Sequence, residues 1–160
     1  MKARKNTLEI IAALLILLWA YAALSKWGDH KAFYRQLYAP YILRPHALLL
    51  FYIIPSIELL AVGLIIWKRS RMIGFALSSL LMMAFTGYIL YILTSSSKLP
   101  CSCGGILSSM HWKEHLYFNI LFLILALTAL TLSWIDRKKQ RQTQPEGVID
   151  TLNLGEAENL

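Results

Sequence analysis

Residues 47–67 read ALLLFYIIPSIELLAVGLIIW, an apolar run of 21 residues with a single acidic side chain, Glu58. A helix needs about 20 apolar residues to cross the ~30 Å hydrocarbon core of a bilayer, so this run predicts a membrane-spanning helix. Three further runs have the same character, at residues 8–25, 72–94 and 116–134. No strand-like alternation of apolar and polar residues competes with helices in them. The sequence therefore predicts an all-α membrane protein, with a bundle of four transmembrane helices formed by residues 1–135.

Composition and charge agree with this fold. Hydrophobic residues make up 57% of the chain and charged residues only 16%, whereas soluble domains are about a quarter charged. The net charge of +7 comes from basic residues at the ends of the apolar runs, which suits membrane anchoring and argues against nucleic-acid binding. Four crossings place ten Lys and Arg residues on one side and six on the other. The positive-inside rule then predicts a multi-pass membrane protein with both termini in the cytoplasm.

The two ends of the chain need separate interpretations. The first run, with its basic start and Ala20-Tyr21-Ala22, has features of a secretory signal peptide. Its length, and the bulky Trp19 and Tyr21 at the cleavage position, favour an uncleaved span instead. Residues 136–160 begin basic and turn acidic with few apolar side chains, so we expect a mostly disordered cytoplasmic tail.

A short amphipathic segment is predicted between the first two spans. Asp29 is expected to cap a helix that runs towards Tyr38. Phe33, Leu37 and Tyr41 fall on one face of this helix. The segment should therefore lie on the outer membrane surface or cap the bundle.

The chain has two cysteines, Cys101 and Cys103, in the loop of residues 94–115. The predicted orientation puts this loop outside the cytoplasm, where thiols form and exchange disulfides. A Cys-x-Cys disulfide closes a very small ring, so it should be labile and oxidising. As a static staple it would constrain little unfolded-state entropy. Redox exchange is the preferred interpretation, and an inert staple is the alternative.

A metal site is a further alternative for this region. Cys101, Cys103, Met110, His111 and His115 provide soft ligands within fifteen residues, a set that suits Cu(I) or zinc. The ligands of such a metal would be the two cysteines and the two histidines, although their spacing matches no standard zinc module. A nearby histidine would alternatively favour the reactive thiolate form of a cysteine.

Glu58 is unusual because it lies near the middle of its span, where an isolated charge is costly. It must be neutral, paired or in water, and we expect a neutral acid that donates a hydrogen bond to Tyr88 or Thr86. Pro55, one turn earlier, interrupts the helix ladder and makes room for a polar pocket, which Asn119 would also fit. The candidate partners of this carboxyl group are Ser56, Thr86, Tyr88 and Lys26. Glu58 is then either a proton-transferring residue or a structural link between helices.

The distribution of the tyrosines along the chain bears on whether the protein has a cavity. All eight map to the outer half of the membrane or to outer loops. An interfacial belt would normally place tyrosines at both interfaces. The one-sided distribution therefore also suggests a wet or ligand-holding outer cavity.

Several motifs along the chain resemble a known family. They are YAALSK at 21–26, Phe33, PSIE at 55–58, FT at 85–86, CSCGG at 101–105, and Trp112 followed by Asn119. Over residues 8–135 this pattern resembles the MauE branch of the DoxX-like membrane proteins. The resemblance implies a four-helix inner-membrane protein, related to one implicated in maturing the disulfide-rich small subunit of methylamine dehydrogenase beside a thioredoxin-like partner. DoxX relatives are linked to quinone-coupled sulfur chemistry.

The preferred function is a membrane thiol–disulfide relay. Its cysteine pair would exchange with an extracytoplasmic thioredoxin-like protein or a disulfide-bearing client. The chain has no second cysteine pair, so an external electron acceptor is required, and a quinone in the outer cavity is expected. The predicted residues are Glu58 for proton transfer and Lys26, Tyr52, Tyr88 and Asn119 for quinone binding. The alternatives are a non-catalytic subunit or assembly factor of a larger membrane complex, and copper handling.

Overall fold

The computed structural model describes residues 2–38, 40, 43–94 and 112–142. Its elements are α1 (Lys2–Gly28), α2 (His30–Tyr38), the 3-10 turn η1 (Arg44–His46), α3 (Ala47–Ile66), α4 (Arg71–Thr94) and α5 (Trp112–Gln142). Within the described ranges all regular structure is helical, and α1, α3, α4 and α5 are long and apolar enough to cross a membrane. This confirms the predicted all-α, four-span fold.

The last helix is longer than the apolar run that predicted it. α5 continues to Gln142, past the point where the tail was expected to begin at residue 136. The residues concerned, DRKKQRQ, are mostly good helix formers, and Asp136 forms an ion pair with Arg4 of α1. A low content of apolar residues therefore marks the end of the hydrocarbon-crossing part but not the end of the helix. Residues 143–160 lie outside the described part of the chain.

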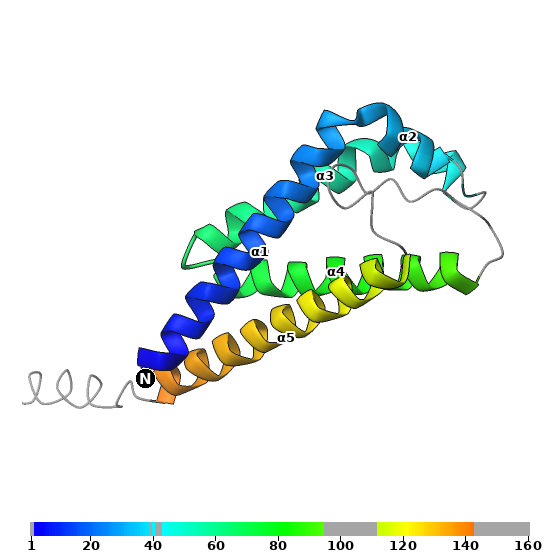
Figure 1. Ribbon diagram of the computed structural model, residues 1–160. Helices are drawn as coiled ribbons and strands as arrows, with labels where there is room; N and C mark the ends of the chain where they lie inside the picture. Colours follow the sequence, from blue (N-terminus) through cyan, green and yellow to red (C-terminus); the bar gives the residue numbers. More distant parts are fainter. Residues whose placement is uncertain (1, 39, 41–42, 95–111, 143–160) are drawn as a thin grey trace, which may run out of the picture.

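The four spans form two close pairs, α1 with α3 and α4 with α5. Figure 1 shows the pairs meeting at the end that carries the N-terminus and spreading apart toward the end where α2 lies. Where the pairs meet, the core contains Leu15, Trp19, Ile65 and Phe75, which have almost no solvent exposure. The indole N–H of Trp19 donates a 2.9 Å hydrogen bond to the Ser78 hydroxyl, which ties α1 to α4 inside this core.

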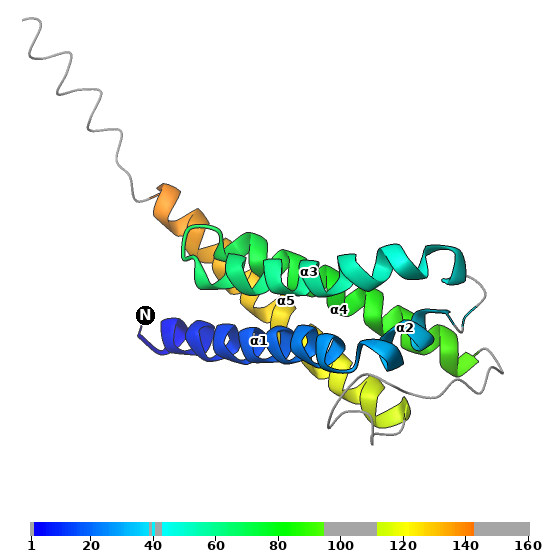
Figure 2. The same cartoon turned by 90° about the horizontal axis from the view of Figure 1, so that it is seen from above.

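Ion pairs join the helices at the end where the N-terminus lies. Arg4 of α1 lies 3.2 Å from the Asp136 carboxylate of α5, and Arg71 of α4 lies 2.6 Å from Glu9 of α1. The start of α1 and the last part of α5 therefore lie at the same end of the bundle, as Figures 1 and 2 show. This arrangement follows from an even number of crossings. The assignment of this end to the cytoplasm stays a prediction.

The short helix α2 covers the opposite end. The Asp29 carboxylate accepts a 3.2 Å hydrogen bond from the Ala32 N–H, so Asp29 caps the helix as predicted. Phe33 and Leu37 are buried and pack against Leu50, Phe51 and Ile54, near the start of α3. Of the two predicted positions for this segment, it takes the one that caps the bundle. Tyr41 lies outside the described residues.

The glycine Gly74 permits the close approach of α4 to α3. A Cβ atom at this position would lie 2.7 Å from Ile65 Cγ1, 2.8 Å from Ile65 N and 3.0 Å from the Leu64 carbonyl carbon. Two of these atoms belong to the backbone, so a small side chain would force the helices apart.

We predict that Gly74→Ala destabilises the protein by about 1–3 kcal/mol, the usual cost of overpacking. Without a clash, replacing glycine by alanine would stabilise a helix by about 1 kcal/mol. A loss of stability would therefore point to overpacking. Gly63→Ala is the matched control, because a Cβ there meets no atom within 4 Å. Thermal unfolding in detergent measures both variants. Equal melting temperatures for the two would contradict the close-approach argument.

Candidate functional site

A cavity of about 340 Å³ lies among the helices toward the end covered by α2. This volume is within the usual range of ligand pockets. The wall is mostly apolar and comes from all five α-helices. Its polar and charged side chains are Lys26, Gln36, Glu58, Tyr88, His115 and Asn119.

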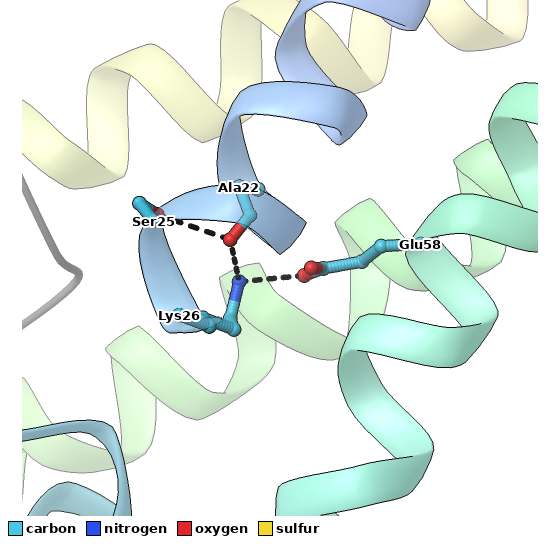
Figure 3. A network of polar contacts seen from close by, with 4 residues as sticks. All are labelled: Ala22, Ser25, Lys26 and Glu58. Carbon is cyan, nitrogen blue, oxygen red and sulfur yellow. Dashed lines mark hydrogen bonds and ion pairs between the residues drawn. The ribbon is translucent and has the colours of Figure 1, made fainter. Parts of the chain in front are cut away.

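The centre of the site is an ion pair between α1 and α3. Lys26 Nζ lies 2.7 Å from Glu58 Oε1, and it also donates a 3.2 Å hydrogen bond to the Ala22 carbonyl (Figure 3). The Glu58 side chain is 0% exposed and that of Lys26 is 13% exposed. The Ser25 hydroxyl donates to the same Ala22 carbonyl. The ammonium group compensates the buried carboxylate, as an ionised group in a membrane span requires.

Two aromatic rings complete the surroundings of the lysine. Lys26 Nζ lies 5.7 Å from the centroid of Phe33 in α2 and 5.7 Å from that of Phe85 in α4. Both distances allow cation–π attraction. The ammonium is therefore held by contacts from α1, α2, α3 and α4, which leaves it little freedom to move.

The remaining polar groups come from α4 and α5. His115 and Asn119 are buried, and they lie one turn apart on the same face of α5. The Asn119 side-chain amide donates a 3.2 Å hydrogen bond to the His115 carbonyl. Tyr88 contributes from the last part of α4. These groups place hydrogen-bonding side chains on the wall formed by the second helix pair.

Comparison with known proteins identifies the family. A family model described as methylamine utilisation protein MauE matches residues 4–132. The chain belongs to the MauE family. The match includes every residue of the cavity wall, and it agrees with a multi-pass membrane protein. No curated protein and no solved structure matched the chain. The wider DoxX-like grouping stays a prediction.

The structure places Lys26, one of the four candidate partners of Glu58, 2.7 Å from its carboxylate. Ser56 instead donates to the Tyr52 carbonyl at 2.7 Å, and the Thr86 hydroxyl has no hydrogen-bond partner among the described residues. The reason for expecting a neutral carboxyl was the cost of an isolated charge, and the ammonium at 2.7 Å removes that reason. A cavity is present beside Glu58 in this MauE-family protein, but its wall is mostly apolar and does not include Pro55, so the polar pocket expected from Pro55 stays a prediction.

Three of the four predicted quinone-binding residues share the cavity. Lys26, Tyr88 and Asn119 line it, together with Glu58. Tyr52 does not, because it is 64% exposed and lies outside the cavity wall. Tyr52 precedes Glu58 by six residues, which places the two side chains about 120° apart around the α-helix and therefore on different faces. The prediction that Tyr52 binds a quinone gains no support from this position and stays a prediction.

The tyrosines in general do not line the cavity. Tyr88 is the one member of the described set in its wall. Most of the others are exposed at the surface of the bundle: Tyr34, Tyr38, Tyr52, Tyr91 and Tyr117. The interfacial belt therefore explains these five better than a tyrosine-lined cavity does. A cavity is present, but phenylalanine and aliphatic side chains form most of its wall.

The predicted sulfur and metal residues fall mainly outside the described chain. Cys101, Cys103, Met110 and His111 belong to the part that is not described, whereas His115 lies in the cavity wall. Within the described residues no group of three or more His, Cys, Asp and Glu side chains is placed to hold a metal ion. The redox and metal interpretations of the cysteine pair both stay predictions.

Sequence reasoning gave no role in the site to several residues around the lysine. Phe33 and Phe85 flank the ammonium, and Gln36 and Leu37 of α2 line the cavity. Phe33 and Phe85 did occur among the motifs shared with the family. That was the available signal, because hydrophobic periodicity does not say which helices of a MauE-family bundle become neighbours.

We predict that Lys26→Met strongly destabilises the protein, by about 3–5 kcal/mol, because it leaves the buried Glu58 carboxylate uncompensated. The double variant Lys26→Met/Glu58→Leu should recover most of this loss, since apolar replacement of a whole buried pair is often neutral. Lys31→Met, on the exposed side of α2, is the control. Thermal unfolding in detergent provides the comparison. A Lys26→Met protein as stable as the parent would show that the pair does not hold α1 to α3.

Proposed function

We propose that this MauE-family protein is a membrane thiol–disulfide relay in which Cys101 and Cys103 exchange with an extracytoplasmic thioredoxin-like protein or client. A quinone in the cavity is the proposed membrane partner for the electrons. The observation that carries the proposal is that residues close to both ends of the cysteine loop line the cavity. Tyr88 and Ile89 line it close to the end of α4, and His115 lines it in the first turn of α5.

Covalent reach supports the same proposal. Cys101 follows Thr94, the last residue of α4, by seven residues. That length of chain spans at most about 25 Å when fully extended. This length limits the distance of Cys101 from Thr94 to about 25 Å, which allows the cysteine pair to reach the cavity.

The exchange balances in electrons and protons. A thiolate attacks a disulfide sulfur, a mixed disulfide forms, and the second thiol displaces the first partner. Oxidation of the Cys101–Cys103 dithiol to the disulfide releases two electrons and two protons. A quinone that accepts the two electrons and the two protons becomes the quinol. The reverse direction uses the same groups. The relay therefore needs a lipophilic ring held beside a proton-carrying group.

Lys26 and Glu58 meet that need. An ammonium has three N–H donors, and among the described residues two acceptors, Glu58 Oε1 and the Ala22 carbonyl, bind it. A third donor is thus available to a quinone carbonyl oxygen, where a fixed positive charge stabilises developing negative charge. Glu58 is the proposed proton-transferring residue, and the apolar walls suit the ring and its tail.

We predict that Cys101→Ser or Cys103→Ser traps a mixed disulfide with an extracytoplasmic protein, because the remaining thiol has no internal partner to resolve it. A membrane-impermeant thiol reagent should label the pair in intact cells after mild reduction. Nonreducing gels and mass spectrometry identify the adduct, and the Cys101→Ser/Cys103→Ser protein is the control that forms none. If neither single variant forms an adduct and the double variant is fully functional, the chain acts as an assembly factor or a non-catalytic subunit.

We predict that Ala22→Leu, which fills part of the cavity beside Lys26, slows quinone-driven oxidation of the cysteine pair at least about tenfold. An overpacking cost within the ~1–3 kcal/mol range, if it opposes quinone binding, corresponds to a rate decrease of about this size. Ala76→Leu is the matched control, since Ala76 is exposed on α4 and is not part of the cavity wall. Stopped-flow oxidation of the purified dithiol by a short-chain quinone measures the rates. Equal rates for both variants and the parent would place quinone oxidation elsewhere.

A further inference from the structure

Basic side chains dominate the end of the bundle opposite the cavity. They come from the start of α1, from the turn between α3 and α4, and from the last turns of α5. The described acidic residues at this end are Glu9 and Asp136, and each is already bound by an arginine, Arg71 and Arg4 respectively. Positive charge at this end therefore exceeds the negative charge that the described chain supplies.

Four of these cations form one group, which we call the basic turn patch: Lys68, Arg69, Arg137 and Lys138. The Arg137 guanidinium donates a 3.0 Å hydrogen bond to the Arg69 carbonyl, which fixes the last part of α5 against the turn after α3. All four residues are exposed. None of them forms an ion pair with a described carboxylate within 4.0 Å. Gathering four like charges is unfavourable unless an anion is present.

Two tryptophans indicate the depth of this patch in the membrane. Trp67 directly follows α3 and is 72% exposed, and Trp134, in the last part of α5, is 53% exposed. Exposed tryptophans at span ends are typical of the headgroup region. Lys138 Nζ lies 4.5 Å from the centroid of the Trp134 ring. The cations therefore follow directly on the interfacial aromatics, at the level of the lipid phosphates.

We propose that the basic turn patch is a binding site for the phosphate headgroup of an anionic phospholipid, with the acyl chains beside Trp67 and Trp134. Two guanidinium groups provide planar, multidentate phosphate contacts, and two ammonium groups add charge without directional demands. Basic groups at this depth are typical sites for anionic headgroups. The site lies at the other end of the spans from the cavity, so it does not depend on the relay.

Quenching of tryptophan fluorescence by brominated lipids tests this assignment. The purified full-length protein is reconstituted into phosphatidylcholine vesicles containing the same fraction of either brominated phosphatidylglycerol or brominated phosphatidylcholine. We expect several-fold stronger binding of the anionic lipid near the tryptophans. Arg69→Gln/Arg137→Gln should abolish this preference. The control Lys31→Gln/Arg35→Gln removes the same charge from exposed residues of α2 and should keep it.

A second variant separates binding from folding, because Arg137→Gln also removes the hydrogen bond to Arg69. Lys68→Gln/Lys138→Gln leaves that hydrogen bond in place, and we expect it to reduce the several-fold preference by at least about twofold, because two of the four positive charges near the headgroup are lost. Equal quenching by the two lipids in the parent protein, or an unchanged preference in this variant, would overturn the proposal. Loss of the preference in sodium phosphate but not in sodium chloride of equal ionic strength would support the proposal, since free phosphate would then compete with the headgroup for the same site.

Discussion

A charge buried in a membrane span must be compensated, and in this protein that constraint joins Glu58 of α3 to Lys26 of α1. An apolar contact tolerates some sliding and rotation of two helices, whereas a 2.7 Å contact between ionised groups tolerates little. The pair therefore fixes the relative depth and rotation of the two helices. It also determines which face of α3 lies against the cavity, and hence which residues of that helix a ligand can contact.

The two ends of the bundle are packed differently. At the end where α1 begins and α5 ends, Trp19 and Phe75 lie in the core and the pairs Arg4–Asp136 and Glu9–Arg71 join the helices around it. At the other end the helix pairs diverge (Figure 1), and α2 packs against α1 and α3 and contributes side chains to the cavity wall. A bundle joined at one end can keep a cavity open at the other, and Trp19 connects the two regions because it belongs to the core and also lines the cavity.

Much of the fold was predictable because its determinants are local. Span length follows from apolar runs such as residues 47–67, and the cap of α2 follows from Asp29. The site was less accessible, because it depends on which helix faces meet. The cost of burying Glu58 showed that it needed compensation, but the sequence offered four candidate partners, and only the packing of the helices shows that Lys26 is bound to it. Tyr52 shares its helix with Glu58 but not its face, and it lies outside the cavity wall.

Lysine side chains have different roles at the two ends of the bundle, and the groups around each lysine determine its role. Lys26 is enclosed by a carboxylate, a carbonyl and two rings, so its charge is balanced and its position is fixed. It can orient one further acceptor without attracting anions in general. Lys68 and Lys138 are exposed beside arginines whose positive charge adds to their own, so their attraction for anions is long-range and weakly directional. Whereas an unpaired lysine attracts anions in general, a lysine whose charge is balanced by a carboxylate thus acts as a specific hydrogen-bond donor. That is the property a quinone carbonyl requires and a lipid phosphate does not.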